Sequence, residues 1–148
     1  MKAVVQRVKK TTLSVEGNLI SSIDFGLVVY FCAESKDEVD KNKKIELLSK
    51  KIANLRVFED ENGKMNRSVL DVGGQILSVS QFTLCGDVSH GNRPSFVTAM
   101  QADKAKEVYF EFCKALRLFG LTVKEGLFGA DMTISQTNDG PVTIWYDI

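Results

Sequence analysis

Two short polar clusters hold the residues best suited to chemistry in this chain. The first is Ser80-Gln81-Phe82-Thr83, which follows an apolar run, and the second is Asn138-Asp139-Gly140-Pro141-Val142-Thr143. Hydroxyl nucleophiles in acyl chemistry are usually activated by a histidine that a third group orients. The sole histidine, His90, lies between Gly86 and Gly91, which argues against rigid positioning. GxSxG is also absent, so a catalytic triad is not predicted.

Local pattern alone gives both clusters an ordinary structural interpretation. Alternation along a strand would put Gln81 and Thr83 on one face and their neighbours on the other. Asn-Asp-Gly-Pro is a good turn sequence, and an X–Pro bond in a folded protein is cis only about 5–6% of the time. The spacing by itself therefore predicts a half-buried strand and a turn.

Metal and nucleotide chemistry is not predicted. Walker A, GxGxxG, HExxH and EF-hand patterns are all missing from the sequence. Cys32, Cys85 and Cys113 are widely spaced in apolar surroundings, which favours buried reduced thiols over a disulfide framework. With only His90 to join them, a zinc site would lack recognisable ligand spacing. We expect no metal and no cofactor.

Composition indicates a globular chain without a general affinity for nucleic acid. Its 148 residues suit a single domain, 1–148, and 44% hydrophobic with 26% charged residues is ordinary. Nineteen Lys and Arg balance nineteen Asp and Glu, so no net cationic field exists to hold phosphates. The lysines of 41–51 fit a solvated helix face. Any RNA contact must be local, and DNA is not an expected partner.

The beginning of the chain has no targeting features. MKAVVQRVKK contains neither an apolar core nor a small-residue cleavage site, and no apolar run is long enough to span a bilayer. We therefore expect a cytoplasmic protein with no membrane partner.

The first third of the chain predicts a hairpin, a central strand and a helix. Extended residues before and after Glu16-Gly17-Asn18 indicate an antiparallel hairpin, and LVVYFCA, which follows Gly26, is typical of a strand buried on both faces. Ser35 and Glu38 fit a capping box that begins a helix. The apolar stripe of that helix consists of Ile45, Leu48, Ile52 and Leu55.

The remainder predicts further strands and a second helix. Turn signals at 60–63 and at 73–74 precede a strand that we extend through QILSVSQFTL. The second helix should span 103–119, with Gly120 at C′ and one buried face formed by Val108, Tyr109, Phe112, Leu116 and Phe119.

Three more strands are expected after this helix: LTVKEG, ADMTISQT and PVTIWYDI. A turn at 138–140 should join the last two. Many strands with two segregated helices predict an α+β fold, with curved, barrel-like antiparallel β-sheets and two packed helices.

Six motifs together resemble one family. RVFEDENGKMN, LDVGG, SQFTL, GNRPSF, FGADM and NDGPVT occur in the order and spacing of the D-aminoacyl-tRNA deacylase family, also called D-tyrosyl-tRNA deacylase, in its bacterial and eukaryotic form. The match extends from MKAVVQRV to the C-terminus. The resemblance implies an enzyme that hydrolyses the ester of D-aminoacyl-tRNA, as chiral proofreading in translation.

The resemblance also implies a homodimer with its active sites at the subunit interface. The SQFTL segment of one subunit would face the NDGPVT turn of the other, in an isologous arrangement. The family has a cis Gly-Pro bond, here Gly140 and Pro141, whose carbonyls exclude the side chain of an L-amino acid. Arg7 matches the arginine that braces this turn, while Phe128 and Met132 match residues lining the pocket.

For catalysis, the resemblance implies a role for the substrate itself. Thr83 is the obvious hydroxyl, yet the sequence supplies no base for it. The resemblance implies that the terminal 2′-hydroxyl of tRNA assists hydrolysis of the ester, while backbone amides near Phe82 stabilise the oxyanion. Ser80 and Thr83 would line the pocket, and Gln81 would orient the substrate. Glycine has no side chain to exclude, so glycyl-tRNA, including tRNA-Ala mischarged with glycine, should also be cleaved.

The 86–93 loop departs from the family pattern. His90 and Asn92 stand where basic residues are usual, whereas Arg93 is retained. If this loop contacts tRNA phosphates through Arg93 and His90, the substitution should weaken RNA binding and make it depend more steeply on pH, because histidine loses its proton near neutral pH. Two rival hypotheses are a noncatalytic nucleic-acid-binding dimer, disfavoured by the neutral charge, and a generic esterase, disfavoured because no triad is visible.

Overall fold

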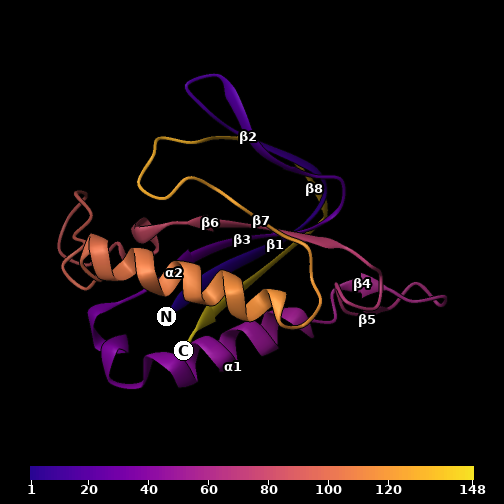
Figure 1. The fold of residues 1–148 in the computed structure, drawn as a ribbon, viewed down its shortest axis with the longest axis horizontal. Helices are drawn as coiled ribbons and strands as arrows, with labels where there is room; N and C mark the ends of the chain where they lie inside the picture. Colours follow the sequence, from indigo (N-terminus) through magenta and orange to yellow (C-terminus); the bar gives the residue numbers. More distant parts are fainter.

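The computed structural model describes residues 1–148 and shows a curved sheet with two helices packed on it (Figure 1). The six-stranded sheet has the order β2-β1-β3-β6-β7, and β8 also pairs with β1. Its strands are β1 (Lys2–Val15), β2 (Asn18–Ile23), β3 (Gly26–Cys32), β6 (Gln75–Ser80), β7 (Val123–Glu125) and β8 (Thr133–Asp147). A separate pair consists of β4 (Phe58–Glu59) and β5 (Met65–Arg67). The predicted α+β class with a barrel-like sheet is confirmed.

The sheet is mixed, whereas the sequence predicted it to be antiparallel. β3 pairs with β6 in parallel, and β6 pairs with β7 in parallel. The reason lies in the connections, because each of these pairs is separated in sequence by one of the two helices. A helical crossover returns the chain to the same end of the sheet, so the next strand runs in the same direction.

The opening hairpin and the central strand agree with their predictions. β1 and β2 pair antiparallel around a turn in which Glu16 has φ +49° and Gly17 has φ +78°. β3 lies between β1 and β6, and all of its residues except Tyr30 are buried. Burial on both faces explains why this strand contains apolar residues at successive positions instead of alternating.

Helix α1 (Lys41–Ala53) begins later than predicted. The segment that starts at Ser35 is a 3₁₀ helix, η1 (Ser35–Asp40). The backbone amide of Glu34 donates to the Asp37 carboxylate at 2.8 Å, so the cap lies one residue before the predicted one. Ser35 instead donates its hydroxyl to the Ala99 carbonyl at 3.2 Å. The predicted apolar stripe holds, with Ile45, Leu48 and Ile52 buried and Leu55 partly buried.

Helix α2 (Ala102–Arg117) confirms most of its predicted buried face. Tyr109, Phe112 and Leu116 are buried against the sheet, and the Phe112 ring stacks on Phe31 of β3 with centroids 4.4 Å apart. Phe119 was wrongly assigned to this face and is exposed, because the helix ends before it. Gly120 has φ +82° and lies two residues beyond the Leu118 cap, one position later than predicted.

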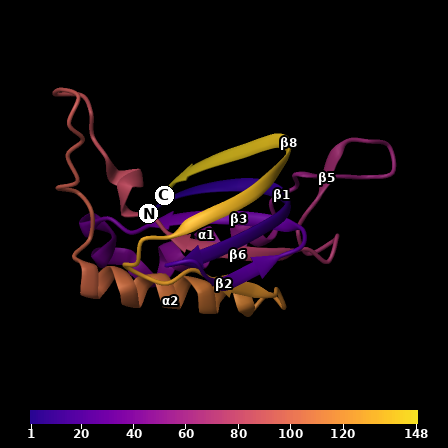
Figure 2. The same ribbon diagram turned by 90° about the horizontal axis from the view of Figure 1, so that it is seen from above.

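Both helices cover the same face of the sheet, as the two views in Figures 1 and 2 show. The main core forms between this face and the helices. A smaller apolar cluster occupies the other face and contains Val8, Leu13, Ile23, Val28, Leu77 and Val79. None of the helices is both long and apolar enough to cross a bilayer.

The last strand is continuous, whereas the sequence predicted two strands joined by a turn. Both halves of β8 pair antiparallel with β1 and run in the same direction along it. The register shifts where Gln6 pairs with Thr143 and Val8 pairs with Asn138. One residue of β1, Arg7, therefore lies opposite the four residues 139–142 of β8. Asn-Asp-Gly-Pro forms a bulge in this strand, and the Gly140–Pro141 bond within it is cis.

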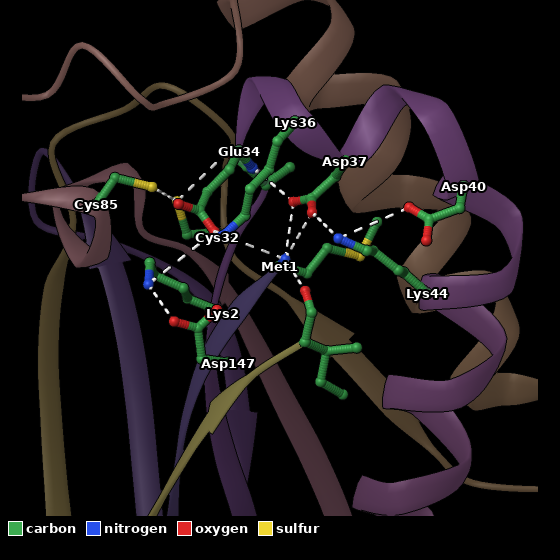
Figure 3. Close-up of polar contacts among 12 residues, drawn as sticks. Met1, Lys2, Cys32, Glu34, Lys36, Asp37, Asp40, Lys44, Cys85 and Asp147 are labelled. Atoms are coloured by element: carbon green, nitrogen blue, oxygen red, sulfur yellow. Dashed lines mark hydrogen bonds and ion pairs between the residues drawn. The ribbon is translucent and has the colours of Figure 1, made fainter.

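A buried ionic cluster fixes the start of β1 to the helical side of the molecule (Figure 3). The Met1 ammonium donates to the Asp37 carboxylate at 2.8 Å and to the Ile148 carbonyl at 2.6 Å. Lys44 donates to the same carboxylate at 2.7 Å. Burial alone would raise the pKa of Asp37, but these hydrogen bonds and one from the Glu34 amide outweigh it, and the pKa is lowered.

Candidate functional site

The segment after β6 is the first component of the site, and it is not a strand. β6 ends at Ser80, and residues Phe82–Cys85 form a 3₁₀ helix, η2. The prediction of a strand through QFTL was therefore wrong. The Gln81 side chain donates from Nε2 to the Thr83 hydroxyl at 2.5 Å. The two side chains are therefore neighbours, as predicted, but they lie at the start of η2 and not on one face of a strand. The first amides of a helix have no partner within it, which leaves those of Phe82 and Thr83 available.

A cavity of about 580 Å³ opens beside this segment. Four stretches of the chain that are distant in sequence build its walls. They are 31–33 at the end of β3, 79–82 at the end of β6, 99–105 around the start of α2, and 128–134 leading into β8; Tyr109 adds to the α2 wall. The volume falls within the range that small-molecule sites usually have.

The walls of the cavity are mostly apolar. Of the eighteen lining residues, fourteen are hydrophobic, and polar side chains come from Ser80, Gln81 and Asp131. Burial raises the pKa of Tyr109 well above its ordinary value, and burial likewise raises that of Cys32, so both groups are neutral near pH 7. Asp131 is the one lining residue with a charged side chain. The cavity is thus apolar with a single carboxylate.

The structure brings together five of the residues selected from the sequence. Ser80, Gln81, Phe82, Phe128 and Met132 all line the cavity. Thr83 is not part of the lining and reaches it only through its contact with Gln81. Sequence reasoning missed Asp131 and Tyr109. Asp131 lies inside the FGADM motif, which could have directed attention to it, whereas Tyr109 was assigned only to the packed face of α2.

No histidine lines the cavity, and the side-chain hydrogen bond of Thr83 is with Gln81. His90 and Arg93 are both exposed on the 86–99 loop, which projects from one end of the molecule (Figure 2). Neither residue belongs to the cavity lining. The arrangement therefore provides an apolar binding pocket and free backbone amides instead of an activated nucleophile.

The bulge of β8 is held by Arg7, which is buried. Its Nε donates to the Asp139 carbonyl at 3.1 Å, and its Nη1 donates to the Val57 carbonyl at 2.6 Å. The Asp139 carboxylate lies 3.2 Å from the same Nε and 3.3 Å from the Lys9 ammonium. One planar guanidinium thus joins the bulge to the base of the β4–β5 hairpin, which a single-donor side chain could not do.

Gly140 and Pro141 do not line the cavity of their own chain and are exposed. Gly140 has φ +123°, and a Cβ placed there would lie 2.8 Å from Val142 Cγ2 and 3.3 Å from Arg7 Nη2. Glycine is therefore required at this position both for its backbone angle and for lack of space.

Two of the three cysteines meet beside the site. Cys32 and Cys85 are buried free thiols with their sulfur atoms 2.7 Å apart, as Figure 3 shows. Cys32 also lies 3.6 Å from the Phe82 carbonyl of η2. The sequence predicted buried, reduced thiols, but only the fold places this pair together.

Comparison with known proteins assigns the family. The family model described as D-Tyr-tRNA(Tyr) deacylase matches residues 4–147. Proteins named D-aminoacyl-tRNA deacylase are 51% identical in Thermus aquaticus, with 99% of this chain and 95% of that protein covered, and 49% identical in Deinococcus radiodurans, with 100% of both covered.

Two solved structures share the fold of this chain. The c-Myc DNA Unwinding Element Binding Protein superposes with a TM-score of 0.92 at 44% identity, covering 100% of this chain and 99% of that one. A probable eukaryotic D-amino acid tRNA deacylase shares the fold, with a TM-score of 0.86 at 18% identity, covering 99% and 98%. This chain belongs to the D-Tyr-tRNA(Tyr) deacylase family and is a hydrolase.

Proposed function

We propose that this protein hydrolyses the ester bond of D-aminoacyl-tRNA and releases free D-amino acid and tRNA in the cytoplasm. The observation that carries the proposal is the apolar cavity at the end of β6, beside the first amides of η2. An aminoacyl group fits such a volume, and its ester carbonyl would meet the amides of Phe82 and Thr83. Those amides would stabilise the oxyanion that forms when water attacks.

Active sites in this proposal lie at the interface of a homodimer. The sheet face opposite the helices carries a group of half-buried polar and aromatic side chains that supports such an interface. Tyr30 donates to Gln136 at 3.0 Å, and Gln136 donates to Gln6 at 2.8 Å. Trp145, which lies on β8 like Gln136, is 51% exposed. Mixed aromatic and amide groups of this kind are common at protein interfaces, and a twofold axis would create two equivalent sites.

Chirality is selected by the bulge of the partner subunit. Gly140 and Pro141 would enter the cavity of the other protomer, where their rigid carbonyls leave no volume for an L side chain. Arg7 holds the bulge from behind through its bond to the Asp139 carbonyl. Because glycine has no side chain to exclude, glycyl-tRNA, including glycine mischarged on tRNA-Ala, would also be hydrolysed.

Catalysis uses the substrate in place of a protein base. Thr83 receives a hydrogen bond from Gln81 and has no histidine near it. The ester of an aminoacyl-tRNA is already labile, so the terminal 2′-hydroxyl can assist the attack once the carbonyl is polarised. Phe128 and Met132 would close the apolar wall, while Arg93 and His90 on the projecting loop would contact the phosphates of tRNA.

The decisive experiment compares D-Tyr-tRNA with L-Tyr-tRNA as substrates for the purified protein. We expect rapid loss of the D ester and little loss of the L ester. Equal rates for the two enantiomers would contradict selection by the bulge.

DNA binding without a catalytic role is the second candidate function, since one structural relative has DNA binding in its name. No hydrolysis of either ester together with tight binding of DNA would favour it, although the balanced charge argues against this result.

A further inference from the structure

The protein has a projecting segment at each end. The β4–β5 hairpin extends from one end of the molecule and the 86–99 loop extends from the other, as both views show (Figures 1 and 2). Phe82 precedes this loop and Ala99 ends it, and both residues line the cavity. The loop therefore lies on the cavity side of the molecule, and the hairpin lies away from it.

The hairpin adjoins the bulge of β8. Arg7 donates from Nη1 to the carbonyl of Val57, which directly precedes β4, and from Nε to the carbonyl of Asp139 in the bulge. Arg7 pairs with Leu27 at the start of β3, whereas the cavity begins at Phe31 near the end of that strand. Since a strand rises about 3.3 Å per residue, roughly 13 Å separates these two positions. Hairpin and bulge thus share one end of the protomer, opposite its own cavity.

The hairpin exposes cations that are not neutralised within the chain. Arg56 and Lys64 are both exposed, and neither takes part in an ion pair of the structure. The Arg56 guanidinium donates from Nε to the Asn66 carbonyl at 2.9 Å, which leaves its two Nη groups for another acceptor. Met65, next to Lys64, is 59% exposed. Cations beside an exposed apolar side chain suit a nucleic-acid strand, which presents both phosphates and bases.

The acidic residues of the hairpin limit how it can bind an anion. The Asp60 carboxylate accepts the backbone amides of Lys64 and Asn62 at 3.0 and 2.9 Å, and these hydrogen bonds lower its pKa. The turn therefore uses this carboxylate. Within 56–67 the cations and carboxylates are equal in number: Arg56, Lys64 and Arg67 against Glu59, Asp60 and Glu61. Phosphate would be bound through individual contacts and not through net charge.

We propose that the β4–β5 hairpin of one subunit binds the 3′ strand of the tRNA whose aminoacyl group occupies the cavity of the partner. This inference rests on the proposed function, in which the bulge of one subunit enters the cavity of the other. A segment that adjoins the bulge then adjoins that cavity as well. The 86–99 loop of the subunit that contains the cavity would approach the same strand from the other side. Arg56 and Lys64 would contact phosphates close to the ester, so each tRNA would touch both subunits.

Removing the two cations tests their contact with phosphates. In about 0.1 M salt, R56Q/K64Q should lower kcat/KM for D-Tyr-tRNA about fivefold or more. The slope of log kcat/KM against log salt concentration should become shallower by about 0.7 to 1 for each cation removed. The maximal single-turnover rate should stay within about twofold of wild type, because the cavity is unchanged.

Two further variants exclude a general effect on the fold or on charge. The Lys64 side chain makes no hydrogen bond or ion pair, so K64Q should fold normally and show about half of the change in slope. K43Q/K50Q removes the same charge from the exposed face of α1 and should leave the slope unchanged. A wild-type slope in R56Q/K64Q, or an equal change in K43Q/K50Q, would overturn the inference.

Mixed dimers test whether the hairpin acts on the partner's cavity. A102L narrows the cavity, since Ala102 lines it and is exposed at the start of α2. Coexpression of A102L with R56Q/K64Q gives three dimers, which ion exchange separates because each R56Q/K64Q subunit has lost two positive charges. In the mixed dimer the open cavity lies in one subunit and the intact hairpin in the other. We expect about half of the wild-type kcat/KM, with the wild-type slope, because one of two equivalent sites remains. The slope of the R56Q/K64Q homodimer would contradict action across the interface.

The same measurements separate failure of this inference from failure of the proposed function. A wild-type protein that is monomeric or leaves D-Tyr-tRNA intact would refute the proposed function. Unchanged hydrolysis by the A102L homodimer would refute the placement of the acyl group in the cavity. If wild type hydrolyses D-Tyr-tRNA and A102L is impaired, a wild-type slope in R56Q/K64Q would refute the role of the hairpin alone.

Discussion

Arg7 donates a hydrogen bond from Nε to the carbonyl of Asp139 at 3.1 Å, across the position where β8 departs from regular pairing with β1. The two residues are 132 positions apart in sequence. The contact joins a buried side chain of β1, near the start of the chain, to the exposed bulge near its end. The geometry of that bulge, and with it the proposed filter, therefore depends on one side chain from the other end of the sequence.

Replacing Arg7 with lysine should weaken the filter without abolishing the fold. A single ammonium cannot bond both the Asp139 and the Val57 carbonyls, and losing a hydrogen bond from a charged donor costs about 1.5–3 kcal/mol. We expect kcat/KM for D-Tyr-tRNA to fall roughly tenfold or more, measured under single-turnover conditions. K9Q is the control, because Lys9 contacts the same aspartate from an exposed position. If R7K and K9Q behave alike, the bracing role is wrong.

Replacing Gly140 with alanine should distort the bulge locally. The new Cβ would approach Val142 Cγ2 to 2.8 Å in a backbone conformation with φ +123°. Such a conformation costs a non-glycine residue about 1–3 kcal/mol, so the variant should fold with a lower midpoint of unfolding. Discrimination between D- and L-Tyr-tRNA should decrease.

Gly17 offers a matched control for that experiment. Its φ is +78°, and a Cβ there meets nothing within 4 Å, so G17A has a backbone cost without a contact near the bulge. Thermal unfolding and deacylation should be followed in both variants. Loss of discrimination in G17A as well would show that general destabilisation, and not the bulge, is responsible.

The roles of Thr83 and the terminal ribose can be separated by one pair of substrates. The side-chain hydrogen bond of Thr83 is with Gln81 and not with a base, so we expect T83V to deacylate D-Tyr-tRNA at a rate within about tenfold of wild type. Loss of a true nucleophile usually lowers the rate by a factor of about 10⁴ or more. A D-Tyr-tRNA that ends in 2′-deoxyadenosine should react far more slowly than the normal ester. A severe loss in T83V, with normal cleavage of the deoxy substrate, would reverse this assignment.

Removing the carboxylate of Asp37 should destabilise the protein. Asp37 is fully buried and bonds both the Met1 ammonium and Lys44, and breaking a buried ion pair from one side costs about 3–5 kcal/mol. D37N should therefore unfold at a markedly lower urea concentration. D40N provides the control, since Asp40 pairs with Lys44 only at 3.6 Å and is exposed.

The pH dependence of stability follows from the same carboxylate. The pKa of Asp37 is lower in the folded protein than its unfolded value near 3.9, so its contribution is complete above that value. It should disappear as the pH falls through the folded pKa. The difference in unfolding free energy between wild type and D37N should thus shrink only in strongly acidic solution. A difference that already shrinks near neutral pH would point to another group.

The amino-acid sequence determined the local elements of this protein. Apolar periodicity located α1 and most of the buried face of α2, and continuous apolar residues identified β3 as central. Glycine positions marked the turn after β1 correctly. These features depend on residues within one or two turns of each other, so the pattern contains the information that fixes them. The family motifs added the activity and the residues to examine.

Only the tertiary structure decided how distant segments combine. Asn-Asp-Gly-Pro is a turn by local preference, yet β1 is long enough to pair with both flanking segments, and the motif becomes a bulge opposite Arg7. From the sequence alone, a strand that ends at Ser80 could not be distinguished from one that continues through Leu84. The reason is that η2 contacts β3, which is distant in sequence, through Cys32 and the Phe82 carbonyl. Asp131, Tyr109 and Gln81 share a cavity although their sequence spacing says nothing about it. The apolar pattern of the sequence predicts whether a residue is buried, whereas tertiary packing determines which residues it contacts.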